Sequence, residues 1–152
     1  MLASRAFVGL AVRSLNAVDA DVTLPQFRTL VVLAARGARR TQDIAEELQV
    51  NPSTGSRMVD RLERKGLVRR VRPDGDRRVV ELRLTRAGHA VVEEVLARRR
   101  AELERLVAAT AGLWEPSVTW ALTAFAEAAG EMPEQEWWLG FARHAPGEDD
   151  PS

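Results

Sequence analysis

Several residue types are scarce in this 152-residue chain, and each shortage narrows what the protein can do. The chain contains no cysteine, which excludes disulfides, thiol catalysis and thiol-based redox sensing. Only two histidines occur, His89 and His144, and neither has metal-ligand spacing around it, so a zinc site is not expected. No run of about 18 apolar residues occurs, so we expect neither a membrane-spanning helix nor a membrane partner. We also expect no cofactor.

Two further function classes receive no support from the sequence. The apolar stretch at residues 6–15 is interrupted by Arg13 and is followed by no clear cleavage site, which argues against a signal peptide and favours a cytoplasmic protein. There is also no glycine-rich phosphate loop, no histidine–carboxylate constellation and no nucleophile beside a base. We therefore do not expect an enzyme.

The net charge is zero, but the charges are distributed unevenly along the chain. Residues 54–86 carry 11 basic and 5 acidic side chains, whereas residues 112–152 carry 8 acidic side chains against Arg143 alone. Such a concentrated basic segment in a neutral protein predicts a local site for a polyanion. Lys65 is the only lysine, and arginine binds phosphate and guanine edges bidentately. A GC-rich genome, which favours arginine codons, also explains the excess of arginine over lysine.

Apolar periodicity and capping residues divide the chain into seven helices and two strands. Thr23, Thr41 and Thr85 are suited to cap helices, and Pro52 suits a first helical position. A turn at residues 73–76 separates two stretches of strand character. The expected helices are residues 3–18, 24–37, 42–48, 52–66, 86–110, 115–129 and 134–142, and the expected strands are 67–72 and 79–84.

Two short helices joined by a tight turn and followed by a hairpin form the element order of a winged helix-turn-helix, here at residues 41–86. The second helix of such a motif places its first turns in the major groove of DNA. Short hydroxyls there can hydrogen-bond base edges or phosphates, and an arginine can contact guanine bidentately. The candidate contacts on this helix are Ser53, Thr54, Ser56, Arg57 and Arg61.

The expected hairpin tip carries Arg77 and Arg78, either of which can enter a narrow, electronegative minor groove. Simpler interpretations stay open for these positions. An exposed arginine is often only a solvated side chain, Ser53 could serve only as a helix cap, and one of the two tip arginines could pair with Asp76.

Several runs of residues resemble the MarR family of bacterial transcriptional regulators. They are residues 51–62 (NPSTGSRMVDRL), 65–70 (KGLVRR), 76–78 (DRR), 84–88 (LTRAG) and 24–28 (LPQFR). The resemblance covers about residues 3–130 in order and spacing, and it leaves the tryptophan-bearing end of the chain unmatched.

This resemblance implies a mainly α fold with a small β-wing. It implies one domain at residues 1–143, with a winged helix-turn-helix at 24–86 and dimerisation helices at 1–20 and 86–143. The polar, acidic composition of residues 144–152 separately predicts a disordered tail. The partners that the resemblance implies are a second copy of the chain and a pseudo-palindromic double-stranded DNA operator, with repression relieved by a ligand. The family's DNA contacts fall here on Ser53, Thr54, Ser56 and Arg57 in the helix, and on Arg77 and Arg78 in the wing.

The apolar helices at both ends of the chain support a homodimer independently, because a lone winged domain could not cover them. Trp114, Trp120, Trp137 and Trp138 lie in this region, where interface packing is favoured over a ligand cage. A pocket for a phenolic or aromatic effector is expected near the first, second and fifth helices. Its candidate residues are Leu10, Arg13, Ser14 and Arg28.

Two alternatives remain open at this point. Arg13 and Arg28 could bind an effector carboxylate, or both could pair with acidic residues across the dimer. The whole chain could also be a winged-helix module that mainly binds another protein through its acidic tail and binds DNA only weakly.

Overall fold

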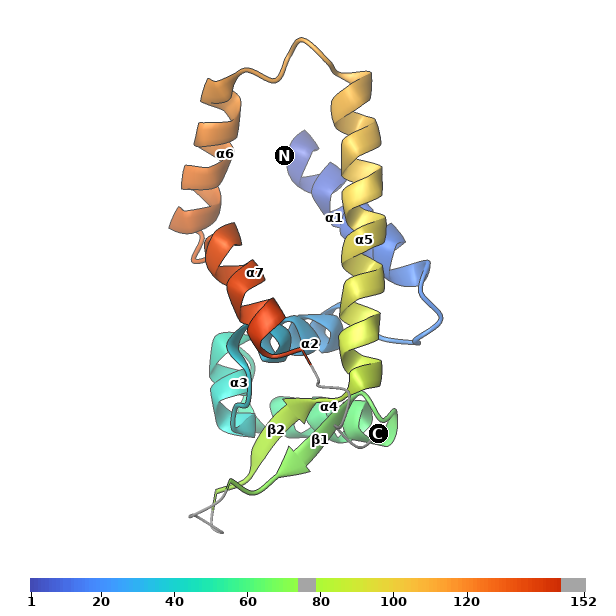
Figure 1. Cartoon of the computed structure of the whole chain (residues 1–152), viewed down its shortest axis with the longest axis vertical. Helices are drawn as coiled ribbons and strands as arrows, with labels where there is room; N and C mark the ends of the chain where they lie inside the picture. Colours follow the sequence, from blue (N-terminus) through green and yellow to red (C-terminus); the bar gives the residue numbers. More distant parts are fainter. Residues whose placement is uncertain (74–78, 146–152) are drawn as a thin grey trace.

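The computed structural model describes residues 1–73 and 79–145, which form seven helices and one antiparallel pair of strands (Figure 1). The predicted fold class, mainly α with a small β-wing, is confirmed. In chain order the elements are α1 (Leu2–Asn16), α2 (Leu24–Arg36), α3 (Thr41–Glu47), α4 (Pro52–Arg64), β1 (Val68–Val71), β2 (Glu81–Leu84), α5 (Arg86–Ala109), α6 (Pro116–Ala128) and α7 (Glu134–Arg143).

The elements form a compact lobe and an extended upper part (Figure 1). The lobe contains α2, α3, α4 and the sheet, and the long helix α5 starts from it and runs away toward the opposite end of the molecule. Helix α1 packs against α5, and α7 returns from the upper part to pack against α2. Helix α2 therefore connects the lobe with the rest of the chain.

The hydrophobic core lies around α2, whose Phe27, Leu30 and Leu33 are almost completely buried. Their spacing of three residues places them on one face of the helix, toward the lobe and α5. Side chains from every other element of the lobe and from the start of α5 complete this core, among them Ile44, Val59, Leu62, Val68, Leu82, Val92 and Val95. The core of the lobe is therefore completed within the same chain.

Most helix starts follow the predicted capping chemistry. Thr23 precedes α2 and its backbone N–H donates to Gln26 Oε1 at 3.0 Å. Thr85 precedes α5 and its hydroxyl accepts from the Gly88 N–H at 3.1 Å. The prediction for Thr41 is wrong, because Thr41 is the first residue of α3 and Arg40 precedes it. The Arg40 N–H donates to the Asp43 carboxylate at 3.0 Å, which satisfies this helix start without a threonine cap.

The two strands pair from Val68 with Leu84 to Val71 with Glu81, so both are shorter than predicted. A short bridge widens this sheet at its base, where Arg39 and Leu82 exchange two backbone hydrogen bonds of 3.2 and 2.7 Å. The bridge joins the end of α2 to the second strand. The predicted tip arginines, Arg77 and Arg78, lie outside the described residues.

Helix α6 differs from the rest of the molecule because none of its residues is buried. Trp120 and Phe125 are 74% and 73% exposed, although the composition of this helix predicts close packing. The described chain thus supplies no covering surface for an apolar helix. Within residues 1–73 and 79–145, no helix has the length and apolar character required to cross a membrane.

Candidate nucleic-acid interface and adjoining cavity

Helices α3 and α4 cross at very short range because Gly55 has no side chain. A Cβ at this position would lie 2.9 Å from Ala45 Cβ, closer than two such carbons approach in proteins. Met58, Val59 and Leu62 extend the same buried face of α4, as the sequence predicts. The opposite face of α4 is consequently held at the surface in a fixed orientation.

Asn51 caps the start of α4. Its Oδ1 accepts hydrogen bonds from the Thr54 N–H and from the Ser53 hydroxyl, both at 2.8 Å. The sequence pattern predicts a turn at Asn51 and offers only Ser53 as a cap, so the cap at Asn51 is a residue that the prediction missed, although asparagine is among the strongest capping residues. The cap orders the first turn of the helix, where Ser53 and Ser56 are exposed and Thr54 is half-buried.

Arg57 and Arg61 follow one turn apart on the exposed face of α4. The Arg57 Nε donates to the Ser53 carbonyl at 3.2 Å, which directs the side chain toward the start of the helix. Neither arginine forms an ion pair with any carboxylate among the residues described. Both guanidinium groups are therefore available to an external anion.

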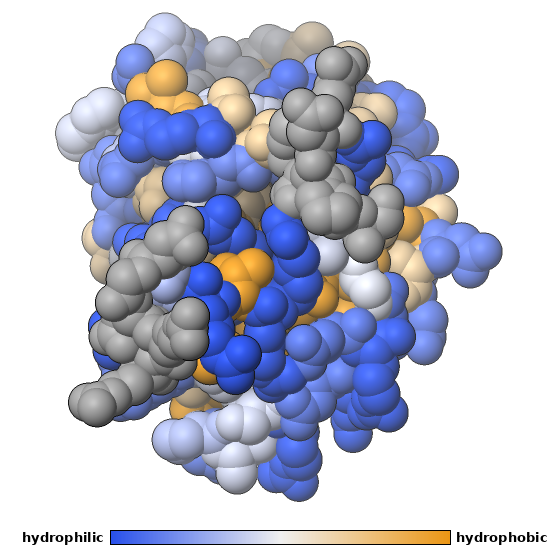
Figure 2. All heavy atoms as spheres, turned by 60° about the horizontal axis from the view of Figure 1, so that its bottom comes forward, coloured by the Kyte–Doolittle hydropathy of each residue, from blue (hydrophilic) through white to orange (hydrophobic). Residues whose placement is uncertain are grey.

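Two other basic side chains near α4 are paired with carboxylates. Arg70 of β1 pairs with Asp60 at 2.8 Å and also with Glu63, which ties the sheet to α4. Lys65 pairs with Asp21 at 3.0 Å. Figure 2 shows the molecule turned so that the lobe end comes forward, and most of the visible surface is hydrophilic. Among the described residues, the positive charge on α4 that has no carboxylate partner lies on Arg57, Arg61 and Arg64.

A cavity of about 650 Å³ lies where α1, α2 and α5 meet the segment before α7. Its walls combine apolar and charged side chains, and Trp137 of α7 closes one side. The lining includes Phe7, Val8, Phe27, Arg28, Val31, Arg36, Glu47, Arg99, Glu131 and Trp137. No cluster of three or more side chains suited to bind a metal ion occurs in the described ranges.

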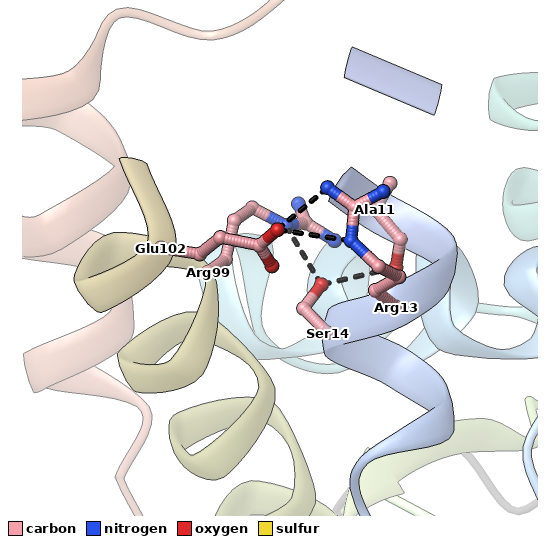
Figure 3. A network of polar contacts seen from close by, with 5 residues as sticks. All are labelled: Ala11, Arg13, Ser14, Arg99 and Glu102. Carbon is pink, nitrogen blue, oxygen red and sulfur yellow. Dashed lines mark hydrogen bonds and ion pairs between the residues drawn. The ribbon is translucent and has the colours of Figure 1, made fainter. Parts of the chain in front are cut away.

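Figure 3 shows two of the four predicted effector residues, Arg13 and Ser14, with their contacts. Arg13 of α1 donates its Nε to Glu102 of α5 at 2.9 Å, so its acidic partner lies in the same chain. The buried Ser14 hydroxyl donates to the Ala11 carbonyl at 3.0 Å. Leu10 is buried beside them on α1. Of the four predicted residues, Arg28 lines the cavity, and its Nη2 lies 4.0 Å from Glu131 Oε1.

Arg99 of α5 was not predicted, because its helix is rich in arginine and glutamate and gives no signal that singles it out. Its Nε lies 3.4 Å from Ser14 Oγ, and its guanidinium carbon lies 5.7 Å from the centre of the Phe27 ring. Burial lowers the pKa of Arg99 from its ordinary value. The other cavity arginines, Arg28 and Arg36, have Glu131 and Glu47 nearby, whereas Arg99 has no carboxylate partner among the described residues.

The chain matches known proteins over the lobe in sequence and over most of its length in structure. The sequence model of the MarR family matches residues 22–80. The HTH-type transcriptional repressor MdtR of Bacillus subtilis is 43% identical over 84 residues, which are 55% of this chain and 54% of that protein. The chain is thus aligned with about half the length of this curated relative.

Two solved structures are similar to this chain over most of its length. The crystal structure of RV1404 from Mycobacterium tuberculosis has 40% sequence identity and a TM-score of 0.83, covering 88% of this chain and 90% of that one. The structure of NadR in complex with 4-hydroxyphenylacetate has 27% identity and a TM-score of 0.65, covering 84% and 87%. With the family match over the lobe and this likeness along most of the chain, the protein belongs to the MarR family.

Proposed function

We propose that this protein is a sequence-specific DNA-binding transcriptional regulator that represses by binding a pseudo-palindromic operator as a homodimer. The observation that carries the proposal is the exposed face of α4, where Asn51 orders the first turn and Arg57 and Arg61 lack carboxylate partners within residues 1–73 and 79–145. A rigid helix with free guanidinium groups suits the major groove, where arginine contacts guanine O6 and N7. Ser53, Thr54 and Ser56 are the proposed neighbours of these contacts, and Arg77 and Arg78 the proposed wing contacts.

The homodimer accounts for the exposed apolar surface at the end opposite the lobe. Phe7 and Val8 of α1, and Trp120 and Phe125 of α6, are large apolar side chains left in solvent by the single chain. Contiguous apolar surface of this kind marks an association site in proteins. A two-fold axis through this end would place two copies of α4 about 34–36 Å apart, one turn of DNA.

An aromatic or phenolic effector is the proposed signal, bound in the cavity among α1, α2 and α5. Two features support this: the cavity has a volume in the range of small-molecule sites, and it combines apolar walls with a few charged groups. NadR, a structural relative, was solved in complex with 4-hydroxyphenylacetate. The cavity adjoins α2, which is part of the lobe's core. A ligand bound in the cavity can therefore change the position of the lobe relative to the rest of the chain.

Selection of bound fragments from the source genome tests the proposal. The protein is mixed with sheared genomic DNA, bound fragments are sequenced, and the affinity for the recovered site is measured at two salt concentrations. A regulator should enrich a few sites that share a palindromic sequence. For each tenfold increase in salt concentration, its association constant should fall by about 0.9 logarithmic units per phosphate contact.

The same measurement separates this function from a winged-helix module that mainly binds protein. Such a module should enrich no sequence and bind random DNA weakly at both salt concentrations. That outcome would overturn the proposal. The molar mass of the protein, measured by light scattering at the protein concentration used in the DNA-binding assay, tests the dimer separately.

A further inference from the structure

Arg40, the residue that precedes α3, occupies a position where a helix favours a capping residue. Serine, threonine, aspartate and asparagine cap helices well, and arginine is not among them. The Asp43 carboxylate accepts the Arg40 N–H at 3.0 Å, and within the described chain the Arg40 side chain makes no capping hydrogen bond. The side chain is exposed. The fold therefore does not depend on the Arg40 guanidinium to begin α3.

The two arginines before Arg40 differ from it because they have partners in the same chain. Arg36 pairs with Glu47 at 2.9 Å, which joins the ends of α2 and α3. Arg39 is half-buried, and its Nη1 donates to the Ala38 carbonyl at 3.0 Å. Arg40 forms no ion pair with any carboxylate in the described part of the chain. Its positive charge is therefore available to an external anion.

The backbone at Arg40 is fixed between the two elements to which we assign DNA contacts. On one side, Thr41 lies beside the first turn of α4, because a Cβ on Gly55 would be 3.8 Å from the Thr41 carbonyl oxygen. On the other side, Arg39 exchanges hydrogen bonds of 3.2 and 2.7 Å with Leu82 of β2, at the base of the wing (Figure 1). The Arg40 side chain thus extends from a fixed point between α4 and the wing.

The geometry of helix-turn-helix complexes indicates which anion would lie at this point. The second helix of the motif enters the major groove, while the first helix crosses the sugar-phosphate backbone. Here α3 is the first helix and α4 is the second. The DNA backbone between the major groove at α4 and the minor groove at the wing should therefore pass the residue before α3. A phosphate group at this place suits an exposed arginine, and such a contact carries no sequence information.

We propose that Arg40 binds a backbone phosphate between the bases at α4 and the flank at the wing, and that it contributes affinity without sequence preference. The inference rests on the proposed function, because it assigns a further contact to the same DNA-binding lobe. It gives Arg40 a different task from Arg57, which we assign to a base. A dimer makes the contact twice, once in each half of the operator.

The first test uses Arg40→Ser, which removes the cation and supplies a good capping residue at the same position. The urea midpoint of this variant should equal or exceed that of the wild type, so that unfolding does not explain a loss of DNA binding. At about 0.1 M salt, binding to the recovered operator and to random duplex DNA should weaken by the same factor, about tenfold or more. The slope of log affinity against log salt should become shallower by about 0.9 per protomer, or about 1.8 per dimer.

Two further variants serve as controls for charge and position. Arg105→Gln removes an exposed arginine from the half of α5 that is remote from the lobe, and it should leave affinity and salt slope unchanged. Arg40→Lys keeps the charge, so its salt slope should stay close to that of the wild type. A wild-type slope in Arg40→Ser, or an equal change of slope in Arg105→Gln, would overturn the proposal.

Methylphosphonate substitution of the operator locates the contact. Each phosphate is replaced in turn by the neutral methylphosphonate, and the affinities of the wild type and Arg40→Ser are compared as a double-mutant cycle. One position per half-site, between the bases protected by α4 and the flank protected by the wing, should weaken wild-type binding about eightfold and Arg40→Ser binding less than about twofold. Equal losses in both proteins at every position would overturn the assignment to Arg40.

Random duplex DNA distinguishes failure of this inference from failure of the proposed function. If the wild type enriches no operator, but Arg40→Ser has a shallower salt slope on random duplex, the phosphate contact stands and the sequence-specific function fails. If the wild type enriches an operator and Arg40→Ser matches its affinity and slope, the function stands and the phosphate contact fails. No binding of either DNA by the wild type would overturn both.

Discussion

The lobe and the far end of this molecule differ in how completely they bury their apolar side chains. In the lobe, α2, α3, α4 and the sheet bury one another, and residues such as Leu30, Ile44 and Leu62 are fully enclosed. At the far end, α6 buries none of its residues and exposes Trp120 and Phe125. The lobe is therefore built to fold from one chain, whereas the far end is suited to be completed by a second copy.

This difference separates the two tasks that we assign to the protein. The lobe presents a polar, arginine-bearing helix face on a rigid base, and the far end presents apolar surface for association. The cavity and α7 lie between them, in contact with α2 on one side and α5 on the other. The following predictions test this division, in order of decreasing expected effect.

The largest effect should come from a charge placed on the apolar face of α6. The substitution Phe125→Glu should convert the dimer to a monomer, because a carboxylate would be buried in the interface. Operator affinity should fall by about 1,000-fold, since the second lobe no longer binds as part of one molecule. Sedimentation and fluorescence anisotropy measure the two effects, with Ser117→Glu at an exposed polar position of α6 as the control. A stable Phe125→Glu dimer would show that α6 is not the interface.

The next largest effect should come from Arg57. The substitution Arg57→Ala should lower specific operator affinity about 100-fold, since each dimer loses two guanine contacts of about 1–3 kcal/mol. The dimer and its thermal stability should not change, because Arg57 is exposed. Arg64→Ala, in the last turn of the same helix, should have a much smaller effect in the same anisotropy assay. Equal losses for both variants would indicate general electrostatic attraction in place of base contact.

A change inside the lobe should affect stability more than assembly. Gly55→Val introduces side-chain atoms where a single Cβ already lies 2.9 Å from Ala45. The free energy of unfolding should fall by about 1–3 kcal/mol, as measured by urea denaturation monitored by circular dichroism. Ser56→Ala, the exposed neighbour, should leave stability almost unchanged. A Gly55→Val variant as stable as the wild type would mean that α3 and α4 can move apart without loss of stability. This result would contradict a rigidly held α4.

A smaller effect is expected from the wing. Arg77→Ala and Arg78→Ala should each weaken operator binding by roughly fivefold, mostly at AT-rich flanks where the minor groove is narrow. Footprinting of the flanks reports this directly. If both footprints match that of the wild type, the wing arginines do not contact DNA.

The smallest effect should come from shortening the end of the chain. A stop codon after Ala145 removes acidic residues but keeps His144 against Gly37, so fold, dimer and DNA affinity should stay within twofold of the wild type. A stop codon after Met132 removes α7 as well and should weaken DNA binding, because α7 packs directly on α2 at Gly140. Equal DNA affinity of the two truncated proteins would show that α7 does not contribute to DNA binding by the lobe.

Local chemistry was sufficient to predict most of the fold. Helix starts at Thr23, Pro52 and Thr85 depend on side chains within three or four residues, and the burial of Met58, Val59 and Leu62 follows from helical spacing. The exception is α3, where the Asp43 carboxylate occupies the Arg40 N–H and moves the helix start by one residue. Both strands are also shorter than their composition predicted, since β1 loses a residue at each end and β2 starts two residues later, because strand ends depend on pairing across the hairpin.

The site was only partly predictable. The exposure of Arg57 and Arg61 follows from their place opposite the buried face of α4, so the sequence sufficed for them. The partner of Arg13 is Glu102, which lies 89 residues away, and no local pattern distinguishes it from the other acidic residues of α5. Arg99 was missed for the same reason, since its burial depends on the packing of α1 and α2 against α5.

The sequence by itself determined, to within one residue, where the described helices of this protein begin, which of their faces are buried in the lobe, and which arginines α4 presents to solvent. These properties depend on contacts between near neighbours along the chain. Only the tertiary structure decided that α7 packs on α2 through Gly140, that Trp137 and Arg99 line one cavity, and that no part of the chain described by the structure covers α6. These contacts join residues that are far apart in sequence. They depend on close packing in three dimensions, which leaves no periodic signal in the sequence.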